Sequence, residues 1–247
     1  MTKITTALLT LTSFAIAADS IASLEQNVLN SKLVTKTGLS YEDNTGNTVS
    51  NKFSLALDAK KSWGKHIFTF DFDMDFASAD KKEDKNIWYT QLSYDRVLNS
   101  TLAVNYLINY KDDRYANLER FNTGPGLMYQ TYKSTTMLLN TQLNILYAKE
   151  NKIINSQWND RDFIASQVGF DYTWKITNNF TFTQNATYNI EVEDNENFTA
   201  YSKTSVESKI TDMFALGVSY KVDYVNVPAS GKEATDTKTL VQFIINY

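Results

Sequence analysis

The 247-residue sequence has no cysteine, only two prolines, eight glycines and a single histidine. The absence of cysteine excludes disulfide bonds, a lipid-modified N-terminal cysteine and any cysteine-ligated metal site. One histidine without cysteine is a poor basis for a metal centre, so we expect neither a metal nor a cofactor. The folded chain must therefore hold together without covalent cross-links.

The sequence also lacks an excess of basic residues and a long apolar run. Its formal net charge is −4, and phosphate binding needs clustered Lys and Arg, so we expect no nucleic-acid partner. No uninterrupted apolar stretch reaches the ~18 residues that a membrane-spanning helix requires. By hydropathy alone, the chain resembles a soluble protein.

The first 17 residues show the three parts of a secretory signal peptide. Lys3 supplies the basic region, residues 4–16 are mostly apolar, and residues 15–17 form the small-residue pattern Ala-Ile-Ala. We expect cleavage after Ala17 and export of the mature chain, with a buried N-terminal helix as the alternative. Residues 18–30 would then form a short periplasmic N-terminal segment.

Residues 68–76, FTFDFDMDF, show the pattern that dominates the rest of the chain. Apolar side chains occupy the even positions, and polar side chains, three of them aspartates, occupy the odd positions. Successive side chains of a β-strand point to opposite faces, so this stretch predicts a strand with one apolar and one polar face. Residues 180–192 repeat the pattern, with Gln184 as the single exception.

The same two-residue period predicts twelve strands. They cover about residues 31–42, 49–62, 66–77, 87–96, 101–113, 118–132, 135–148, 161–176, 180–192, 200–211, 213–226 and 237–247. Tight connections alternate with long polar ones, among them 78–86 and 149–160. This asymmetry, together with an even strand number, is typical of an outer-membrane barrel with short periplasmic turns and longer external loops.

Charged residues separate the two faces of these strands. The apolar faces carry only Lys61, Glu119 and Asp162, each near a strand end, whereas the polar faces carry many acidic and basic residues. A Lys or Arg facing lipid at mid-bilayer costs roughly 2–4 kcal/mol, so the apolar faces are predicted to contact lipid and the polar faces a wet lumen. An exported soluble β-sandwich is the alternative, but its turns would need more Gly and Pro.

We therefore predict an all-β fold: a transmembrane, antiparallel up-and-down β-barrel of about 12 strands, covering residues 31–247. The expected location is the bacterial outer membrane, with membrane lipid as the surrounding partner. Residues 18–30 are either a simple periplasmic tail or a plug that enters the lumen.

Three stretches carry a family resemblance. They are GLSYEDNTGNT (38–48), YKDDRYANLERFNTGPGLMYQTY (110–132) and DTKTLVQFIINY (236–247). They resemble the salt-induced outer-membrane proteins, a family also known as domain of unknown function 481. The resemblance implies an outer-membrane address and recognition of the last strand, ending at Tyr247, by the barrel-assembly machinery. It brings no established activity.

In the family that this sequence resembles, one strand carries a Gly-x-Gly motif, here Gly124 and Gly126. The residue between them is Pro125, which is a departure from the family pattern. Proline cannot donate a hydrogen bond to the strand ladder, so a bulge or kink is predicted there.

Two function classes follow from a polar lumen. A narrow passive channel for small solutes or ions would use polar side chains to replace hydration, whereas a plugged structural or adhesive barrel would carry its interactions in the long loops. We expect an acidic wall to face a more basic one, with Lys52 near Asp75. The candidate lumen-lining residues are Asp71, Asp73, Asp75, Arg120, Lys203, Glu207 and Lys221.

A lipid-facing hydrolase is the third candidate. It would use His66, which falls on the apolar register beside a tight turn, as a general base. No serine lies on that face of the flanking strand ends, so we predict that the protein is not an enzyme.

Overall fold

The computed structural model describes residues 8–9, 33–44, 50–79, 82–114, 117–154 and 157–246. Thirteen strands form one sheet. They are β1 (Leu8–Leu9), β2 (Val34–Asn44), β3 (Ser50–Trp63), β4 (His66–Ala79), β5 (Lys82–Val97), β6 (Leu102–Asp113), β7 (Leu118–Lys133), β8 (Met137–Ile154), β9 (Gln157–Lys175), β10 (Phe180–Glu191), β11 (Phe198–Lys209), β12 (Phe214–Val225) and β13 (Thr235–Asn246).

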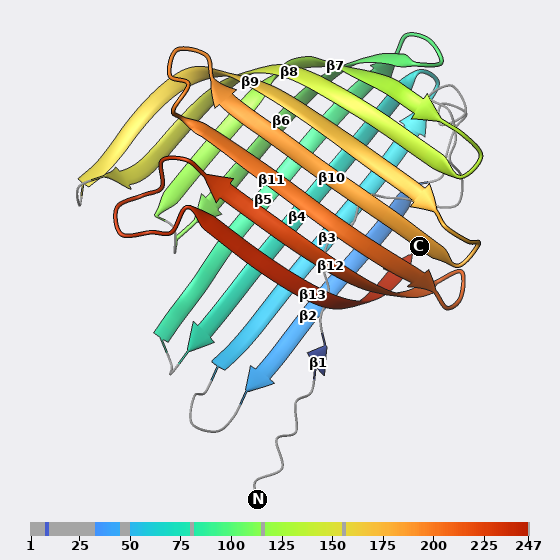
Figure 1. Cartoon of the computed structure of the whole chain (residues 1–247), viewed down its shortest axis with the longest axis horizontal. Helices are drawn as coiled ribbons and strands as arrows, with labels where there is room; N and C mark the ends of the chain where they lie inside the picture. Colours follow the sequence, from blue (N-terminus) through green and yellow to red (C-terminus); the bar gives the residue numbers. More distant parts are fainter. Residues whose placement is uncertain are drawn as a thin grey trace, which may run out of the picture.

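Strands β2 to β13 form a closed antiparallel barrel. Each strand pairs with its neighbours in chain order, and β2 pairs with both β3 and β13, which completes the ring (Figure 1). The two-residue β1 adds to the edge of β2. The predicted fold class, a twelve-stranded up-and-down barrel, is confirmed. Among the described residues, no helix is long and apolar enough to cross a membrane.

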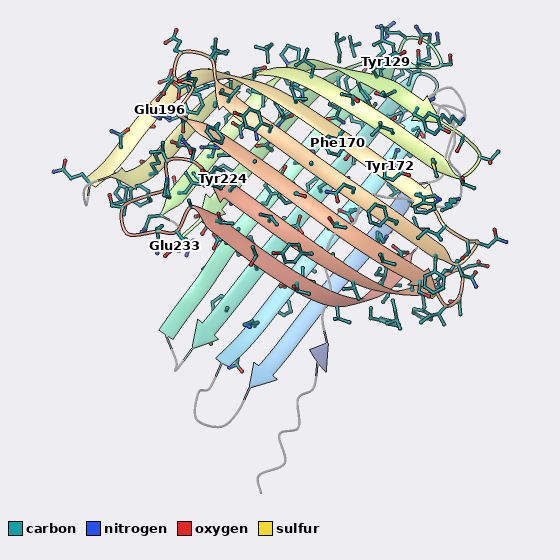
Figure 2. All side chains as sticks on the ribbon, in the orientation of Figure 1. Tyr129, Phe170, Tyr172, Glu196, Tyr224 and Glu233 are labelled. Carbon is teal, nitrogen blue, oxygen red and sulfur yellow. The ribbon has the colours of Figure 1, made fainter. Side chains whose placement is uncertain are left out.

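The outside of the barrel is apolar. In β6, Val104, Tyr106 and Ile108 are 37–45% exposed, while the alternate residues Ala103, Asn105 and Leu107 are buried. Figure 2 shows Tyr129 and Phe170 on the outer side of the wall, where they are 51% and 42% exposed. Such a surface is stable only in hydrocarbon, and closure leaves the barrel without the free sheet edge that hydrocarbon forbids. The protein is an outer-membrane barrel.

Aromatic side chains gather towards one end of the outer wall. There, Trp63 stacks on Phe68 with a ring-centroid distance of 4.7 Å, and Phe68 contacts Tyr94 at 4.8 Å. Near the middle of β4, Phe72 meets Trp88 edge to face at 5.8 Å. Amphipathic rings at the end of the wall suit a membrane interface.

The tight turns use side-chain hydrogen bonds where other β-proteins use Gly and Pro. Asn99, Ser134, Thr177 and Thr211 each accept hydrogen bonds from the backbone N–H groups two and three residues later. Such local bonds stabilise a turn without special backbone angles. In the last of these turns, the hydrogen bond and charge of Lys209 hold the pKa of Asp212 below its usual value. The low Gly and Pro content thus fits twelve strands.

Two of the predicted loops are wrong. Strand β4 runs to Ala79 and β5 begins at Lys82, so most of the stretch 78–86 is paired strand. Likewise β8 runs to Ile154 and β9 begins at Gln157, which replaces the expected loop at 149–160 with a long hairpin. Beyond the membrane both strand faces meet water, so the ladder continues without the apolar alternation that marks a lipid-facing strand.

The predicted bulge at Pro125 is also misplaced. Pairing of β7 with β8 lapses at Gly124 and Pro125 but resumes in the same register at Gly126, and the shift comes between Gln130 and Tyr132. A Cβ atom at Gly124 would overlap the backbone carbonyl oxygen of Ile145. Glycine therefore lets β8 pass close to the proline position, and the register survives the missing hydrogen bond.

Several predictions lie outside the described residues. They include Tyr247, the segment 18–30 and the signal peptide 1–17 apart from Leu8 and Leu9.

The alternation of turns and loops makes a topological prediction. With the short turns in the periplasm, a single cysteine at Lys82 should be labelled in intact cells by a membrane-impermeant thiol reagent, and one at Asn178 should be protected. The absence of native cysteine removes background. Equal labelling of Lys82→Cys and Asn178→Cys, with both exposed after lysis, would contradict the assignment.

Candidate functional site: the charged interior

The three aspartates of the opening pattern share one face of β4. Asp71 lies opposite Asp58 of β3 and Gln91 of β5, and Asp73 lies opposite Ala56 and Tyr89. Neither neighbouring strand supplies a cation at these two levels. The negative charge of these aspartates must therefore be balanced by cations from a more distant part of the wall.

The balancing cations reach the aspartates across the interior of the barrel. Lys221 of β12 places its Nζ 3.8 Å from Asp73 Oδ1, and Lys238 of β13 pairs with Asp75. In the ring, β3 and β2 separate β4 from β13, so these contacts run through the inside. An acidic face of β4 therefore meets basic side chains of β12 and β13.

Ser54 of β3 links Asp75 to Lys238. Its hydroxyl donates to Asp75 Oδ1 at 2.5 Å and accepts from Lys238 Nζ at 3.1 Å. Lys52, the cation expected near Asp75, is opposite Ala77 in the ladder. The cation that contacts Asp75 through the interior comes from the last strand instead of the neighbouring one.

A second contact through the interior joins β2 to β11. Lys36 Nζ lies 3.0 Å from Glu207 Oε2, and both side chains are largely shielded from solvent. Lys203, also on β11, lies opposite Lys221 and is 5% exposed. The candidate residues of β4, β11 and β12 therefore belong to one charged zone.

Arg120 belongs to a different cluster, centred on Glu150 of β8. Glu150 is fully buried and accepts two hydrogen bonds from Arg120, one of them from Nε at 2.9 Å. Lys152 Nζ lies 3.0 Å from Glu150, and Arg161 Nε lies 3.4 Å away. Arg161 also pairs with Glu191 at 3.0 Å. Three cations thus surround two carboxylates.

This cluster, which we call the Glu150 cluster, consists of Arg120, Glu150, Lys152, Arg161 and Glu191. Sequence reasoning missed Glu150 and Lys152 because it assigned them to a loop, and it did not single out Arg161, the first residue of the predicted strand 161–176. The alternation that places Asn144 inside continues through even positions to Glu150 and Lys152, so extending the period past the last lipid-facing residues would have found them.

The Glu150 cluster anchors a connection that crosses the end of the barrel where the β8–β9 hairpin lies. Lys152 Nζ donates to the carbonyl of Val227 at 3.2 Å, and the Ser230 N–H donates to the carbonyl of Ile153 at 3.1 Å. Residues 226–234 join β12 to β13, whereas Ile153 lies at the tip of β8. The β12–β13 connection therefore reaches over β9 to β11 to the β8–β9 hairpin.

Two polar residues of the lipid-side register are satisfied locally. His66 Nδ1 lies 2.7 Å from the Tyr94 hydroxyl within the aromatic group at that end. Gln184 donates to Ser202 at 2.9 Å and accepts from Thr204 at 2.5 Å on the neighbouring strand. Among the described residues, no group of three or more His, Asp or Glu could hold a metal ion.

Comparison with known proteins identifies the family. A family profile described as protein of unknown function, DUF481, matches residues 37–247. The chain belongs to the DUF481 family. The resemblance seen in the sequence is thereby confirmed, and this DUF481 protein matches no curated protein in sequence.

Solved structures similar to this DUF481 barrel are outer-membrane barrels of low sequence identity. The NanC porin has a TM-score of 0.49 and 12% identity, over 87% of this chain and 98% of that one. The translocator domain of the autotransporter NalP from Neisseria meningitidis has 0.46 and 7%, over 91% and 90%. The outer-membrane channel DcaP of Acinetobacter baumannii has 0.40 and 8%, over 98% and 94%.

Proposed function

We propose that this DUF481 barrel is a narrow passive channel for small polar solutes or ions. The Asp73–Lys221 pair carries the proposal, because it brings opposite charges from opposing walls within 3.8 Å. The two side chains keep 26% and 13% of their surface exposed inside the barrel, so water reaches both. Opposed charges along a wet passage replace hydration and select solutes by charge.

Passage past this pair requires the solute to compete with it. A small solute that carries both charge signs, or a hydrated ion, gains contacts with each wall as it separates them. A large neutral solute gains little and meets a constriction only a few ångströms wide. The geometry therefore favours small charged or zwitterionic molecules.

Single-channel recording in planar bilayers tests the channel. The purified, refolded protein should give discrete conductance steps in potassium chloride. The double variant Asp73→Ala with Lys221→Ala should give larger steps, because it widens the passage without changing net charge. Absence of steps from both correctly folded proteins would overturn the channel.

A plugged structural barrel is the second candidate, favoured by the complete burial of Glu150 beneath the β12–β13 connection. In that case neither the native protein nor the double variant conducts, and the interior ion pairs only stabilise the fold.

We also propose that the barrel-assembly machinery recognises the last strand. Its lipid-side register runs through Val241, Phe243 and Ile245, and the sequence ends on the aromatic Tyr247. Deleting Tyr247 should reduce the amount of heat-modifiable barrel in outer-membrane fractions, as followed by gel mobility before and after boiling. Replacing Tyr247 with Phe should leave assembly intact; unchanged assembly of the deletion would contradict this role.

A further inference from the structure

The wall of the barrel has one weak seam, between its first and last strands. Strand β2 pairs with β3 along its whole length, from Val34 to Asn44, and β13 pairs with β12 from Thr235 to Ile245. Between β2 and β13, the ladder that the structure describes consists of Thr37 with Ile245 and Lys36 with Asn246. Figure 1 shows the two strands adjacent near the C-terminus and diverging towards their other ends.

An extended apolar segment lies at this edge. The backbone of Leu8 and Leu9 pairs with Glu42 and Tyr41 of β2. These two positions lie beyond Thr37, where the described β2–β13 ladder stops. These leucines belong to the predicted signal peptide, so the exported chain would leave the edge to another occupant. The edge of β2 thus pairs with the backbone of a two-residue apolar strand.

The interior beside the seam is polar and carries cations. Lys36 and Lys238 stand on the two strands that flank it. Lys238 also reaches over β2 to Asp75 and Ser54, so side chains hold β13 to β3 and β4 where the backbone ladder does not. The wall is therefore closed from the inside by an ion pair.

We propose that the seam between β2 and β13 is a lateral opening through which a small amphiphile moves between the barrel interior and the membrane. An apolar chain occupies the gap between the strands, and an anionic head group meets Lys36 and Lys238 inside. Backbone polar groups left bare in hydrocarbon are costly, so an occupant whose polar head group lies beside this edge is favoured over lipid tails alone. This inference extends the proposed channel to a second exit, but the state of the wall can be tested without conductance.

Disulfide trapping tests the wall, because the chain has no native cysteine. The control pair Thr37→Cys with Ile245→Cys lies in the described ladder and should oxidise readily in membranes, since bridged residues need closely spaced Cα atoms. The test pair Tyr41→Cys with Val241→Cys lies four residues further along the same register and the same face, and should stay reduced. Equal oxidation of the two pairs would overturn the lateral opening. Leu39→Cys with Phe243→Cys serves as the test pair if the first variant does not assemble.

Access from the membrane is tested with N-dodecylmaleimide. Ser54 and Asn105 are 6% and 7% exposed, but only Ser54 contacts the seam through Lys238. The probe should label Ser54→Cys and leave Asn105→Cys largely unlabelled. Dodecanoate should protect Ser54→Cys, and dodecyltrimethylammonium should not. Equal labelling at both positions would show entry through the mouths of the barrel and overturn the proposal, and equal protection by both amphiphiles would overturn the anionic head group.

Discussion

Replacing Glu150 with alanine is expected to lower the free energy of unfolding of the barrel by about 3–5 kcal/mol. Glu150 is completely buried and contacts Arg120, Lys152 and Arg161. Its removal leaves Glu191 as the one carboxylate of the Glu150 cluster, against three cations. Breaking a buried ion pair from one side costs more than the pair contributes, because the remaining charges stay desolvated.

Denaturant unfolding in detergent micelles, followed by gel mobility and tryptophan fluorescence, measures this effect. The matched control is Lys149→Ala on the same strand, whose pair with Asp160 has both side chains more than half exposed. An exposed pair contributes about 0–1 kcal/mol, so the control should be nearly neutral. If Glu150→Ala unfolds at the same denaturant concentration as Lys149→Ala, the Glu150 cluster does not stabilise the barrel. Susceptibility of the 226–234 connection to protease should rise in Glu150→Ala, because Lys152 loses an anchor for its contact with Val227.

Replacing Asp71, Asp73 and Asp75 together with asparagine is expected to reduce cation-over-anion permeability several-fold. The three carboxylates supply the acidic wall, while Lys203, Lys221 and Lys238 remain opposite. Asparagine keeps the size of each side chain and removes its charge, so the passage keeps its width while its field becomes positive. Reversal potentials in a potassium chloride gradient give the permeability ratio.

The matched control removes basic residues in place of acidic ones, so the opposite change in cation-over-anion permeability is expected. Replacing Lys203, Lys221 and Lys238 with glutamine should raise cation preference, whereas Asp212→Asn in an exposed turn should change nothing. In a plugged barrel the aspartate variant would instead lower the melting temperature, because Asp75 loses its charged contact with Lys238. Unchanged selectivity together with unchanged melting would show that these aspartates do not line the lumen.

Much of the barrel was predictable because lipid imposes a simple rule on each strand. Alternation placed the aspartates of β4 on the face opposite its phenylalanines, and in the ladder Asp71 lies opposite Gln91 and Asp73 opposite Tyr89 of β5. The rule failed where lipid ends. The parts of β4, β5, β8 and β9 nearest the β4–β5 and β8–β9 hairpins continue as paired strand in water, where no apolar face distinguishes strand from loop.

Pairing across the interior was beyond a strand-by-strand analysis. Lys238 and Asp75 are 163 positions apart, and their contact depends on how far each strand is shifted along its neighbour around the whole ring. The Glu150 cluster depends in addition on the β8–β9 hairpin rising past β10, which brings Lys152 to the connection from β12.

The sequence by itself thus determined the barrel, its strand number and the division of each strand into a lipid face and a polar face. The reason is that hydrocarbon penalises each misplaced charge locally, so the information lies within a few residues. Only the tertiary structure decided which charges meet, which connection covers the mouth, and how little of the backbone joins β2 to β13. These features arise from the closure of the ring, which sums small shifts between all the strands and is set by no single segment.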